Sequence, residues 1–371
     1  MNDASGALRR TALYGAHLAL GARMVPFGGF EMPVQYTSIL AEHEAVRKRA
    51  GLFDLSHMGQ FELHGSQVGE WAESLTVNRV ANMKPGAARY NIFTNQRGGA
   101  HDDVIFYRVS DDDWLLVVNA SNADAMWAVV SAAQAGDVRL TNLHGERALI
   151  AIQGPRAASL LQPYVEADLA GLRYYACTRT RVRETREPIL IARTGYTGED
   201  GFELFLSNDE AVGVWDMLLA ENRKHGLAAC GLGARDVLRL EAGMPLYGHE
   251  MDEEITPLQA GLAWAIKFDK PAFVGKDALA AQRDADDYAR IVGVTMDGRA
   301  PARAGYAVFA GGERAGEVRS GSWGPSVGKN VATALVVPSA AAEGTPLEIE
   351  IRGTRHPAVT VPLPFYRRPK K

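Results

Sequence analysis

The pattern of apolar residues changes at about Ile291, and this change constrains the fold more than any other feature of the chain. Beyond it, short strand-like runs alternate with glycine, proline and serine turns as far as Pro364, which is typical of a small all-β barrel or sandwich. Before it, strand-like and helix-like patterns follow one another, which favours α+β layers. The polar stretch 282–289 is the expected linker between the two parts.

The length supports a division into domains, because 371 residues exceed the roughly 250–300 that one hydrophobic core can organise. We therefore expect two or three domains. Ahead of the barrel, apolar periodicity predicts helices at 38–50, 67–75, 122–133, 156–162, 210–219 and 234–242. It predicts strands at 53–63 (interrupted by a polar turn at Ser56 and His57), 88–93, 103–109, 114–118, 148–153 and 188–193.

Composition argues against several classes of protein. A formal net charge of −4 is unlike the strong basic excess of dedicated nucleic-acid-binding domains. The N-terminus lacks the apolar core of a signal peptide, and no run approaches the roughly 20 apolar residues of a membrane helix. We therefore expect a cytoplasmic protein without a membrane span.

Two cysteines, Cys177 and Cys230, are present in the chain. A reducing compartment fits so small a number, and two buried free thiols are a better interpretation than one disulfide, which the sequence leaves open. Neither a CxxC pair nor an HExxH motif occurs, so we expect no metal site.

The glycine-rich stretch 195–201 is the most distinctive motif. Three glycines in seven residues let a backbone turn tightly and approach a ligand. The spacing matches neither the dinucleotide fingerprint nor the P-loop. Spacing alone favours an ordinary surface turn. However, the aromatic Tyr196 and the carboxylate of Glu203, beside flexible backbone, could hold a flat, polar heterocycle.

Two adjacent aspartates, Asp102 and Asp103, stand where a turn leads into an apolar strand. The ordinary interpretation of such a pair is a solvated strand start. Alternatively, one carboxylate points inward and stabilises a nearby cation, with burial raising its pKa. Because neighbours on a strand point to opposite faces, only one of the two can do this, and we expect the other to be solvated.

Two arginines, Arg235 and Arg239, share one face of the helix expected at 234–242. They could be a surface pair that bridges to nearby carboxylates such as Asp236 and Glu241. Alternatively, one guanidinium binds a carboxylate or a polar ring through two hydrogen bonds. The adjacent Ser56 and His57 do not indicate a hydrolase, because neighbouring residues seldom make the hydrogen bond that activates a nucleophile and no GxSxG elbow is present.

Taken in order along the chain, these motifs closely resemble the glycine cleavage T-protein family. The matching stretches are 33–36 (PVQY), 42–43 (EH) with Arg47, 51–58 (GLFDLSHM), 88–90 (ARY), 98–99 (GG) with the pair at 102–103, 153–155 (QGP), 193–203 (RTGYTGEDGFE), 231–248, 320–322 (SGS), 324–326 (GPS) and 364–365 (PF). The resemblance spans essentially the whole sequence, and its specificity comes from the ordered set.

The resemblance implies a three-domain, folate-binding α+β fold. A discontinuous first domain (1–53 and 147–281) would enclose an inserted α+β domain (54–146) that carries Asp103, and a β-barrel (290–371) would follow. It also implies an aminomethyltransferase. The lipoylated H-protein would present an aminomethyl group on sulfur, and tetrahydrofolate, a cosubstrate, would take the carbon while ammonia leaves. We expect a monomer.

The resemblance also suggests roles for particular residues. Asp103 matches the catalytic aspartate, which would stabilise positive charge on the departing carbon or deprotonate the folate nitrogen. The positions that match the family's folate site are Met58, Tyr90, Asp103, Tyr196, Glu203, Arg235 and, facing the glutamate tail, Arg367 or Arg368, of which Arg368 is preferred. One departure is His101, which replaces an aliphatic residue and either bonds Asp102 or is simply solvated; we favour the second.

Three alternatives stay open at this point. Related folate-dependent demethylases share the fold and the folate site, and they are the strongest competitor. A folate-binding iron–sulfur assembly relative would carry a cysteine near 255–262, where this chain reads ITPLQAGL. A pure interaction scaffold would not need the carboxylate and arginine set. The basic tail (Arg367, Arg368, Lys370 and Lys371) is either solvated or attracts an acidic partner.

Overall fold

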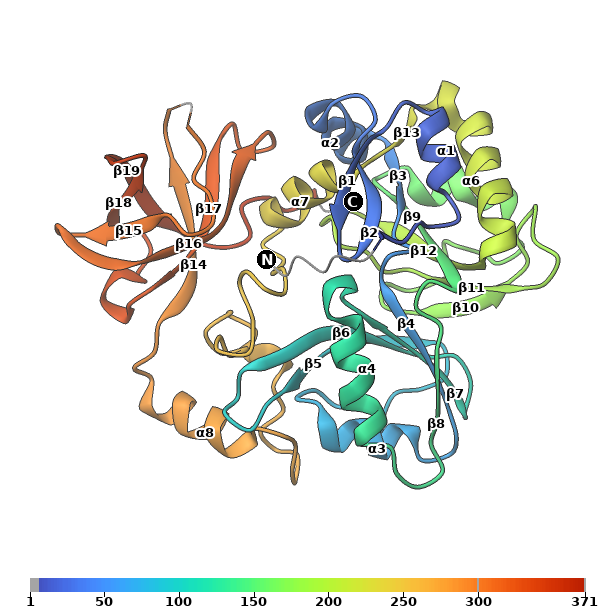
Figure 1. The fold of residues 1–371 in the computed structure, drawn as a ribbon, viewed down its shortest axis with the longest axis horizontal. Helices are drawn as coiled ribbons and strands as arrows, with labels where there is room; N and C mark the ends of the chain where they lie inside the picture. The colour runs from blue at the N-terminus through green and yellow to red at the C-terminus, as the bar shows by residue number, and fades with distance from the viewer. Residues whose placement is uncertain (1–6, 299, 370–371) are drawn as a thin grey trace.

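The computed structural model describes residues 7–298 and 300–369. Figure 1 shows three lobes: a barrel, a lobe built on a six-stranded sheet, and a lobe built on a five-stranded sheet. No helix within the described ranges is both long enough and apolar enough to span a membrane.

The six-stranded sheet forms the centre of the first lobe. Its strands follow the order β10 (Cys177–Thr180), β11 (Ile189–Ala192), β12 (Gly201–Ser207), β9 (Arg147–Gln153), β3 (Ala50–Asp54), β13 (Leu227–Ala229). All neighbours are antiparallel except β13 and β3. The helices of this lobe are α1 (Tyr14–Ala19), α2 (Ile39–Lys48), α5 (Ala157–Leu161), α6 (Asn208–Asn222) and α7 (Leu232–Glu241).

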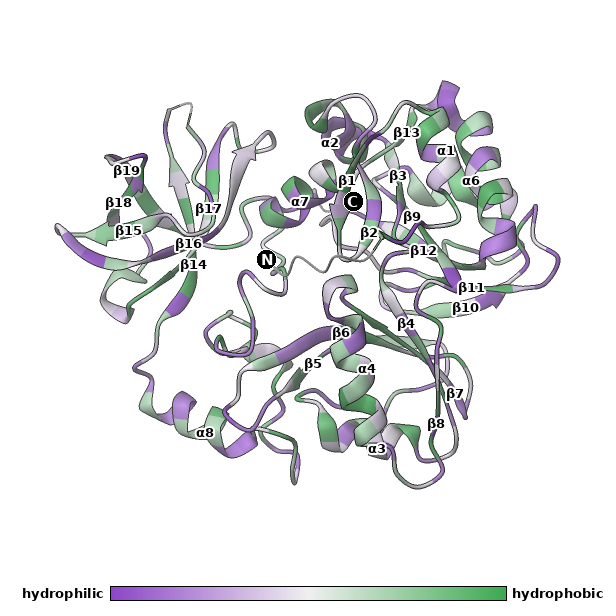
Figure 2. Ribbon diagram, viewed as in Figure 1, coloured by the Kyte–Doolittle hydropathy of each residue, from purple (hydrophilic) through white to green (hydrophobic). Residues whose placement is uncertain are grey.

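Helix α6 shows why these segments are amphipathic. Its buried residues Ala211, Val214, Trp215 and Leu218 recur every three or four positions, and they join the sheet residues Leu52, Ile150 and Leu204 in one core. Figure 2 shows the hydrophobic and hydrophilic bands alternating along the same helix.

The five-stranded sheet has the order β5 (Ala87–Thr94), β6 (Ala100–Arg108), β7 (Asp113–Val118), β4 (Gly59–His64), β8 (Arg139–Asn142). Helices α3 (Val68–Leu75) and α4 (Ala123–Ala132) belong to this lobe (Figure 1). Along β6, the buried Val104 and Phe106 alternate with the less buried Asp103 and Ile105. This period of two is expected for a strand whose faces differ in burial, and it controls where Asp103 points.

The C-terminal lobe is a closed barrel in the order β14 (Arg290–Met296), β17 (Lys329–Val336), β16 (Glu313–Gly324), β15 (Ala307–Ala310), β18 (Pro346–Ile351), β19 (Thr354–Val361). Antiparallel pairing of β14 with β19 closes the ring. The β-barrel predicted from about Ile291 is therefore confirmed. A hairpin of β1 (Arg23–Phe27) and β2 (Phe30–Gln35) lies outside the three large sheets.

The linker prediction at 282–289 is wrong for its first half, because α8 (Lys276–Ala285) extends through it. Leu279 is the buried residue of this helix, and Gln282 Oε1 accepts a 2.8 Å hydrogen bond from the Thr256 hydroxyl. A single buried leucine is too weak a periodic signal to recognise in the sequence. The domain limits at 53, 146 and 281 stay predictions, because strand pairing assigns strands to a lobe without fixing the residue at which a domain begins or ends.

The predicted helices and strands ahead of the barrel all correspond to elements, with shifted ends. The interruption of 53–63 is confirmed, since β3 ends at Asp54 and β4 begins at Gly59. Both cysteines are buried and free, as predicted.

Candidate active site

Asp103 lies on β6 between two hydrogen-bond donors. The Tyr90 hydroxyl, on the adjacent strand β5, donates to Asp103 Oδ2 at 3.1 Å, and Asn119 Nδ2 donates to Oδ1 at 2.8 Å. Burial raises the pKa of Asp103 to about 6, although these two hydrogen bonds oppose the shift. The carboxyl group therefore titrates close to neutral pH. Among the described residues no cation forms an ion pair with it.

Asp102 is completely buried, so the expectation that the second aspartate is solvated is wrong. Asn119, which directly follows β7, donates to Asp102 Oδ1 through Nδ2 at 2.7 Å and to Oδ2 through its backbone N at 3.1 Å. Burial and the charge of Asp103 raise the pKa of Asp102 well above its ordinary value. The Asn119 amide therefore reaches both carboxyl groups, and Asp102 is covered by Asn119 rather than by water.

Tyr196 and Arg235 stack on one another. The Arg235 guanidinium lies 4.7 Å from the centre of the Tyr196 ring, and the Tyr196 hydroxyl donates to the Pro245 carbonyl. Burial lowers the pKa of Arg235, while Tyr196 and Glu203 oppose that shift. No side-chain hydrogen bond or ion pair reaches this guanidinium from the part of the chain that the structure describes. A half-buried cation without a polar partner among the described residues points to a ligand.

Glu203 is 8% exposed and lies on β12. The Tyr107 hydroxyl donates to Glu203 Oε2 at 2.9 Å, and the Thr194 hydroxyl donates to the same oxygen. Within the described residues no hydrogen bond goes to Oε1. This second oxygen therefore remains able to accept from a ligand.

The other expected site residues border this group. Met58 packs against the apolar cluster that contains Tyr107 and Phe205. Arg368 is exposed and lies 5.7 Å above the Tyr174 ring, with its Nη1 4.0 Å from Asp200 Oδ1. Arg367 is also exposed, and Lys370 and Lys371 lie outside the described residues.

The glycine-rich stretch is not the surface turn that its spacing favours. Thr197 and Glu199 are buried within it. A Cβ on Gly195 would lie 2.0 Å from Gln153 Oε1, and one on Gly201 would lie 2.4 Å from Gln153 Nε2. The glycines thus allow the loop to pack directly on β9, which fixes Tyr196 and Glu203 on either side.

The surface-pair interpretation of the two arginines is also wrong. Arg239 is 2% exposed, and it donates to Glu250 Oε2 at 3.1 Å, to Asp236 Oδ1 at 2.8 Å and to Ser320 Oγ at 2.8 Å. Glu250 lies outside the motif and Ser320 belongs to the barrel. Arg239 therefore joins α7 to the barrel, and only Arg235 is available to a ligand.

His57 is 1% exposed, and its Nδ1 has no hydrogen-bond partner among the described residues. Burial lowers its pKa to about 3, and Arg235 adds to this, so the imidazole is neutral. Ser56 Oγ instead accepts from the Leu149 N–H at 3.0 Å. The two side chains do not pair, as expected. His101 contacts Glu253 at 3.2 Å rather than Asp102.

Sequence reasoning missed Asn119, Tyr107 and Trp264. The Trp264 ring packs against the Tyr90 ring, tilted by 30°, with ring centroids 5.7 Å apart. The position of Asn119, directly after an apolar strand, could have indicated a functional role. Nothing in the sequence distinguishes Tyr107 and Trp264, because aromatic residues are common in strands and loops. Within the described ranges, no group of three or more histidine, cysteine or acidic residues could hold a metal ion.

Comparison with known proteins is decisive for the family. The GCVT N-terminal domain model matches residues 13–270, and the model of the glycine cleavage T-protein C-terminal barrel domain matches residues 290–367. The chain belongs to the glycine cleavage T-protein family. The resemblance predicted from the motifs is therefore confirmed, together with the aminomethyltransferase class.

Individual members of the T-protein family cover nearly the full length of the chain. An aminomethyltransferase of Deinococcus deserti is 47% identical over 98% of both chains, and one of Geobacillus thermodenitrificans is 44% identical over 98% of this chain and 100% of its own. The crystal structure of the glycine cleavage system aminomethyltransferase T from Bartonella henselae matches with a TM-score of 0.91 and 33% identity, covering 98% of this chain and 99% of that one. The predicted fold class is thereby confirmed. These full-length matches favour the T-protein over the related demethylases.

Proposed function

We propose that this T-protein transfers the one-carbon unit of an S-aminomethyl-dihydrolipoyl arm, carried by the H-protein, to tetrahydrofolate. Ammonia is released, and 5,10-methylenetetrahydrofolate and the dithiol arm are the other products. One observation carries the proposal: the half-buried carboxylate of Asp103 accepts hydrogen bonds from the Tyr90 hydroxyl and the Asn119 amide and has no counter-cation among the described residues. Such a group stabilises positive charge that arises only during a reaction.

The described residues fit tetrahydrofolate. Its amino-pyrimidine edge offers donors that the unoccupied Oε1 of Glu203 could accept, and the unpaired guanidinium of Arg235 suits the carbonyl of the same ring. Tyr196, Tyr90 and Met58 supply flat and apolar surface, and Arg368 suits the carboxylates of the glutamate tail. Tetrahydrofolate supplies the nitrogen that accepts the carbon.

Within this proposal Asp103 acts on the donor arm. As the carbon–sulfur bond breaks, positive charge develops on the departing carbon, and a fixed carboxylate lowers the energy of that state. Tyr90 and Asn119 hold the carboxylate in place. Burial raises the pKa of both carboxyl groups, and the charge of Asp103 raises that of Asp102 further, so ionisation of both at once is disfavoured.

The H-protein partner, the monomeric state and the cytoplasmic location belong to the same proposal. Membership of the T-protein family supports the partner. The two free buried thiols support a reducing compartment.

The test compares Asp103→Asn with wild type in the formation of ammonia and methylenetetrahydrofolate from aminomethyl-loaded H-protein. We expect kcat to fall by roughly 10²–10³, as when one charge-stabilising group is removed, while tetrahydrofolate binds as before. Asp112→Asn, an exposed aspartate of the same lobe, is the matched control and should retain full activity.

Two results would contradict the proposal. Equal activity of wild type and Asp103→Asn would remove Asp103 from the mechanism. A wild type that binds tetrahydrofolate yet releases no ammonia would remove the transfer reaction itself and favour a demethylase, to be checked with N-methyl and sulfonium substrates.

A further inference from the structure

Trp264 has an exposure that its surroundings do not explain. It lies in a 3-10 turn at Ala263–Ala265 and is 59% exposed, the largest value among the exposed large hydrophobic residues of the described chain. A single exposed aromatic residue is common and means little by itself. Here, however, the ring is inclined at only 30° to the Tyr90 ring, whose hydroxyl binds Asp103. The exposed Trp264 ring is thus connected to the Asp103 carboxylate through a single residue, Tyr90.

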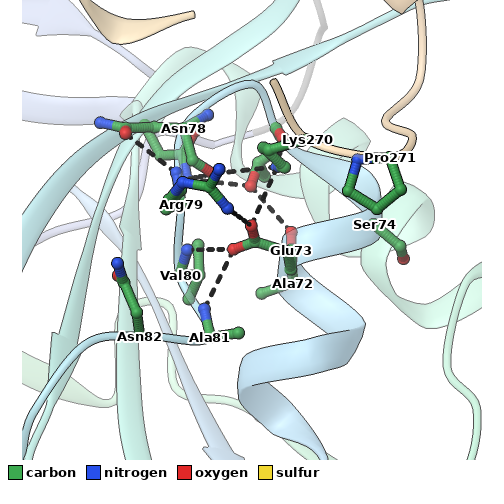
Figure 3. Close-up of polar contacts among 12 residues, drawn as sticks. Ala72, Glu73, Ser74, Asn78, Arg79, Val80, Ala81, Asn82, Lys270 and Pro271 are labelled. Carbon is green, nitrogen blue, oxygen red and sulfur yellow. Dashed lines mark hydrogen bonds and ion pairs between the residues drawn. The ribbon is translucent and has the colours of Figure 1, made fainter. Parts of the chain in front are cut away.

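The segment that carries Trp264 is firmly anchored. The Lys267 N–H donates to the Val77 carbonyl at 2.9 Å, and Lys270, which is fully buried, donates through Nζ to the carbonyls of Thr76 and Asn78. Figure 3 shows Lys270 lying beside Asn78 and Glu73. The Glu73 carboxylate accepts a hydrogen bond from the Ala81 N–H at 3.0 Å. Residues 76–78 are called the 76–78 turn below. The position of Trp264 is therefore set before any ligand arrives.

The 76–78 turn also fixes Tyr90. Asn78 Nδ2 donates to the Tyr90 carbonyl at 3.0 Å, while the Asn78 carbonyl accepts from Lys270. Residues 76–78 therefore hold the backbone of Tyr90 and, through Lys267 and Lys270, the segment that directly follows Trp264. This shared support keeps the two rings in register, although they are 174 positions apart in the chain (264 minus 90).

The charges near Trp264 differ from those at the opposite side of the site. Near Arg368, a cation is exposed beside Tyr174, and this suits an anionic tail. Around Tyr90 and Trp264, the nearby aromatic residue Tyr247 has its pKa raised by burial and then by Asp102, Glu253, Asp252 and Asp103. Several acidic side chains therefore lie around Tyr247. The ammonium of Lys267 donates to the Trp264 carbonyl at 2.7 Å.

The rings of Tyr90 and Trp264, with acidic side chains nearby, favour a particular class of ligand. They disfavour the carboxylates of a folate tail. They suit an uncharged hydrocarbon chain with sulfur atoms, because sulfur packs favourably against aromatic rings, and they suit a terminal ammonium, because cations are attracted to ring faces. The S-aminomethyl-dihydrolipoyl arm has both properties.

We propose that Trp264 is the surface along which the aminomethyl-loaded dihydrolipoyl arm enters, stacked on Tyr90 and leading to Asp103. This inference rests on the proposed function. It assigns Trp264 to the arm itself, and to neither the folate nor the body of the partner protein.

The experiment follows the reverse reaction, in which ammonia and methylenetetrahydrofolate react with a dithiol. Two dithiols are compared, the dihydrolipoyl H-protein and free dihydrolipoamide. For Trp264→Ala, KM should rise by roughly tenfold for both, with little change in kcat, and Trp264→Phe should recover most of the loss. The affinity for tetrahydrofolate, measured by calorimetry, should stay within about twofold of wild type.

The matched control is Trp323→Ala, which removes another exposed tryptophan, 41% exposed on the barrel strand β16, and should leave KM unchanged. Thermal unfolding of each variant checks that the fold is kept, and Trp264→Phe provides the answer if the alanine variant fails to fold. An unchanged KM for both dithiols overturns the inference. A rise in KM for the H-protein alone would assign Trp264 to the partner's body, and weaker folate binding would assign it to folate; either result overturns the inference. Only an inactive wild type would overturn the proposed function as well.

Discussion

Buried carboxylates occur in two regions of this T-protein, and their surroundings are opposite. At the junction of α7 with the barrel, burial disfavours ionisation of Glu250, but Arg239, Ser320 and Thr333 outweigh it and hold the pKa below its ordinary value. At the active site, burial of Asp103 is opposed only by neutral donors, and the pKa rises to about 6. A carboxylate that is paired with a cation contributes to the structure of the fold, whereas one without a counter-cation is available to stabilise positive charge on a substrate.

The largest expected effect comes from breaking the junction. Arg239→Met leaves Glu250 buried without its cation, and we expect a loss of about 3–5 kcal/mol in the free energy of unfolding. Urea denaturation at pH 7 measures it. The double variant Arg239→Met with Glu250→Gln should recover a large part of the loss. Arg314→Met, in an exposed pair with Glu317 at 3.8 Å, is the control and should change little. A loss below about 1 kcal/mol for Arg239→Met would refute the contrast between the two regions.

An intermediate effect of opposite sign is expected at the active site. The raised pKa of Asp103 means that the folded state binds a proton more tightly than the unfolded chain, so ionisation costs stability as pH rises from about 4 through about 6. Asp103→Asn removes this cost, and we expect roughly 1–3 kcal/mol of added stability at pH 7.

The gain should vanish below about pH 4, where wild type is protonated in both states. Thermal unfolding across this pH range measures the difference, with Asp112→Asn as the reference variant. If Asp103→Asn were destabilising at pH 7, the carboxylate would have a stabilising partner that the described residues do not include.

The smallest effect concerns the position of the Asp103 titration. Asn119 favours the ionised form of Asp103, so Asn119→Ala should raise that pKa and shift the acid limb of the kcat/KM profile upward by about one pH unit. Asn142→Ala, an asparagine on β8 whose Oδ1 accepts from the His144 N–H, serves as the control. An acid limb that stays in place would mean that Asn119 supports the fold without tuning the carboxyl group.

The features that could be predicted from the sequence are local. The barrel follows from short strands with frequent turns, and the aspartate pair stands out at the start of an apolar strand, although the choice of Asp103 over Asp102 came from the family resemblance. The partners of these residues are not local. Asn119 covers Asp102 only because β7 lies beside β6, and Ser320 reaches Arg239 across 81 positions of the chain. Helix α8 was not predicted because Leu279 is its one buried residue, and a single apolar position gives no helical periodicity.

The insertion of the five-stranded lobe within the first lobe has a consequence for the order in which the protein is made on the ribosome. Strand β3 must wait for β9, which is translated only after the whole inserted lobe, and for β13, which comes later still. Strands β5, β6 and β7 pair with immediate neighbours and can form first. The strand that bears the aspartates is therefore complete early in synthesis, while Arg368 arrives almost last. A nascent chain stalled before its C-terminus would hold the finished carboxylate site without the cation proposed to receive the folate tail.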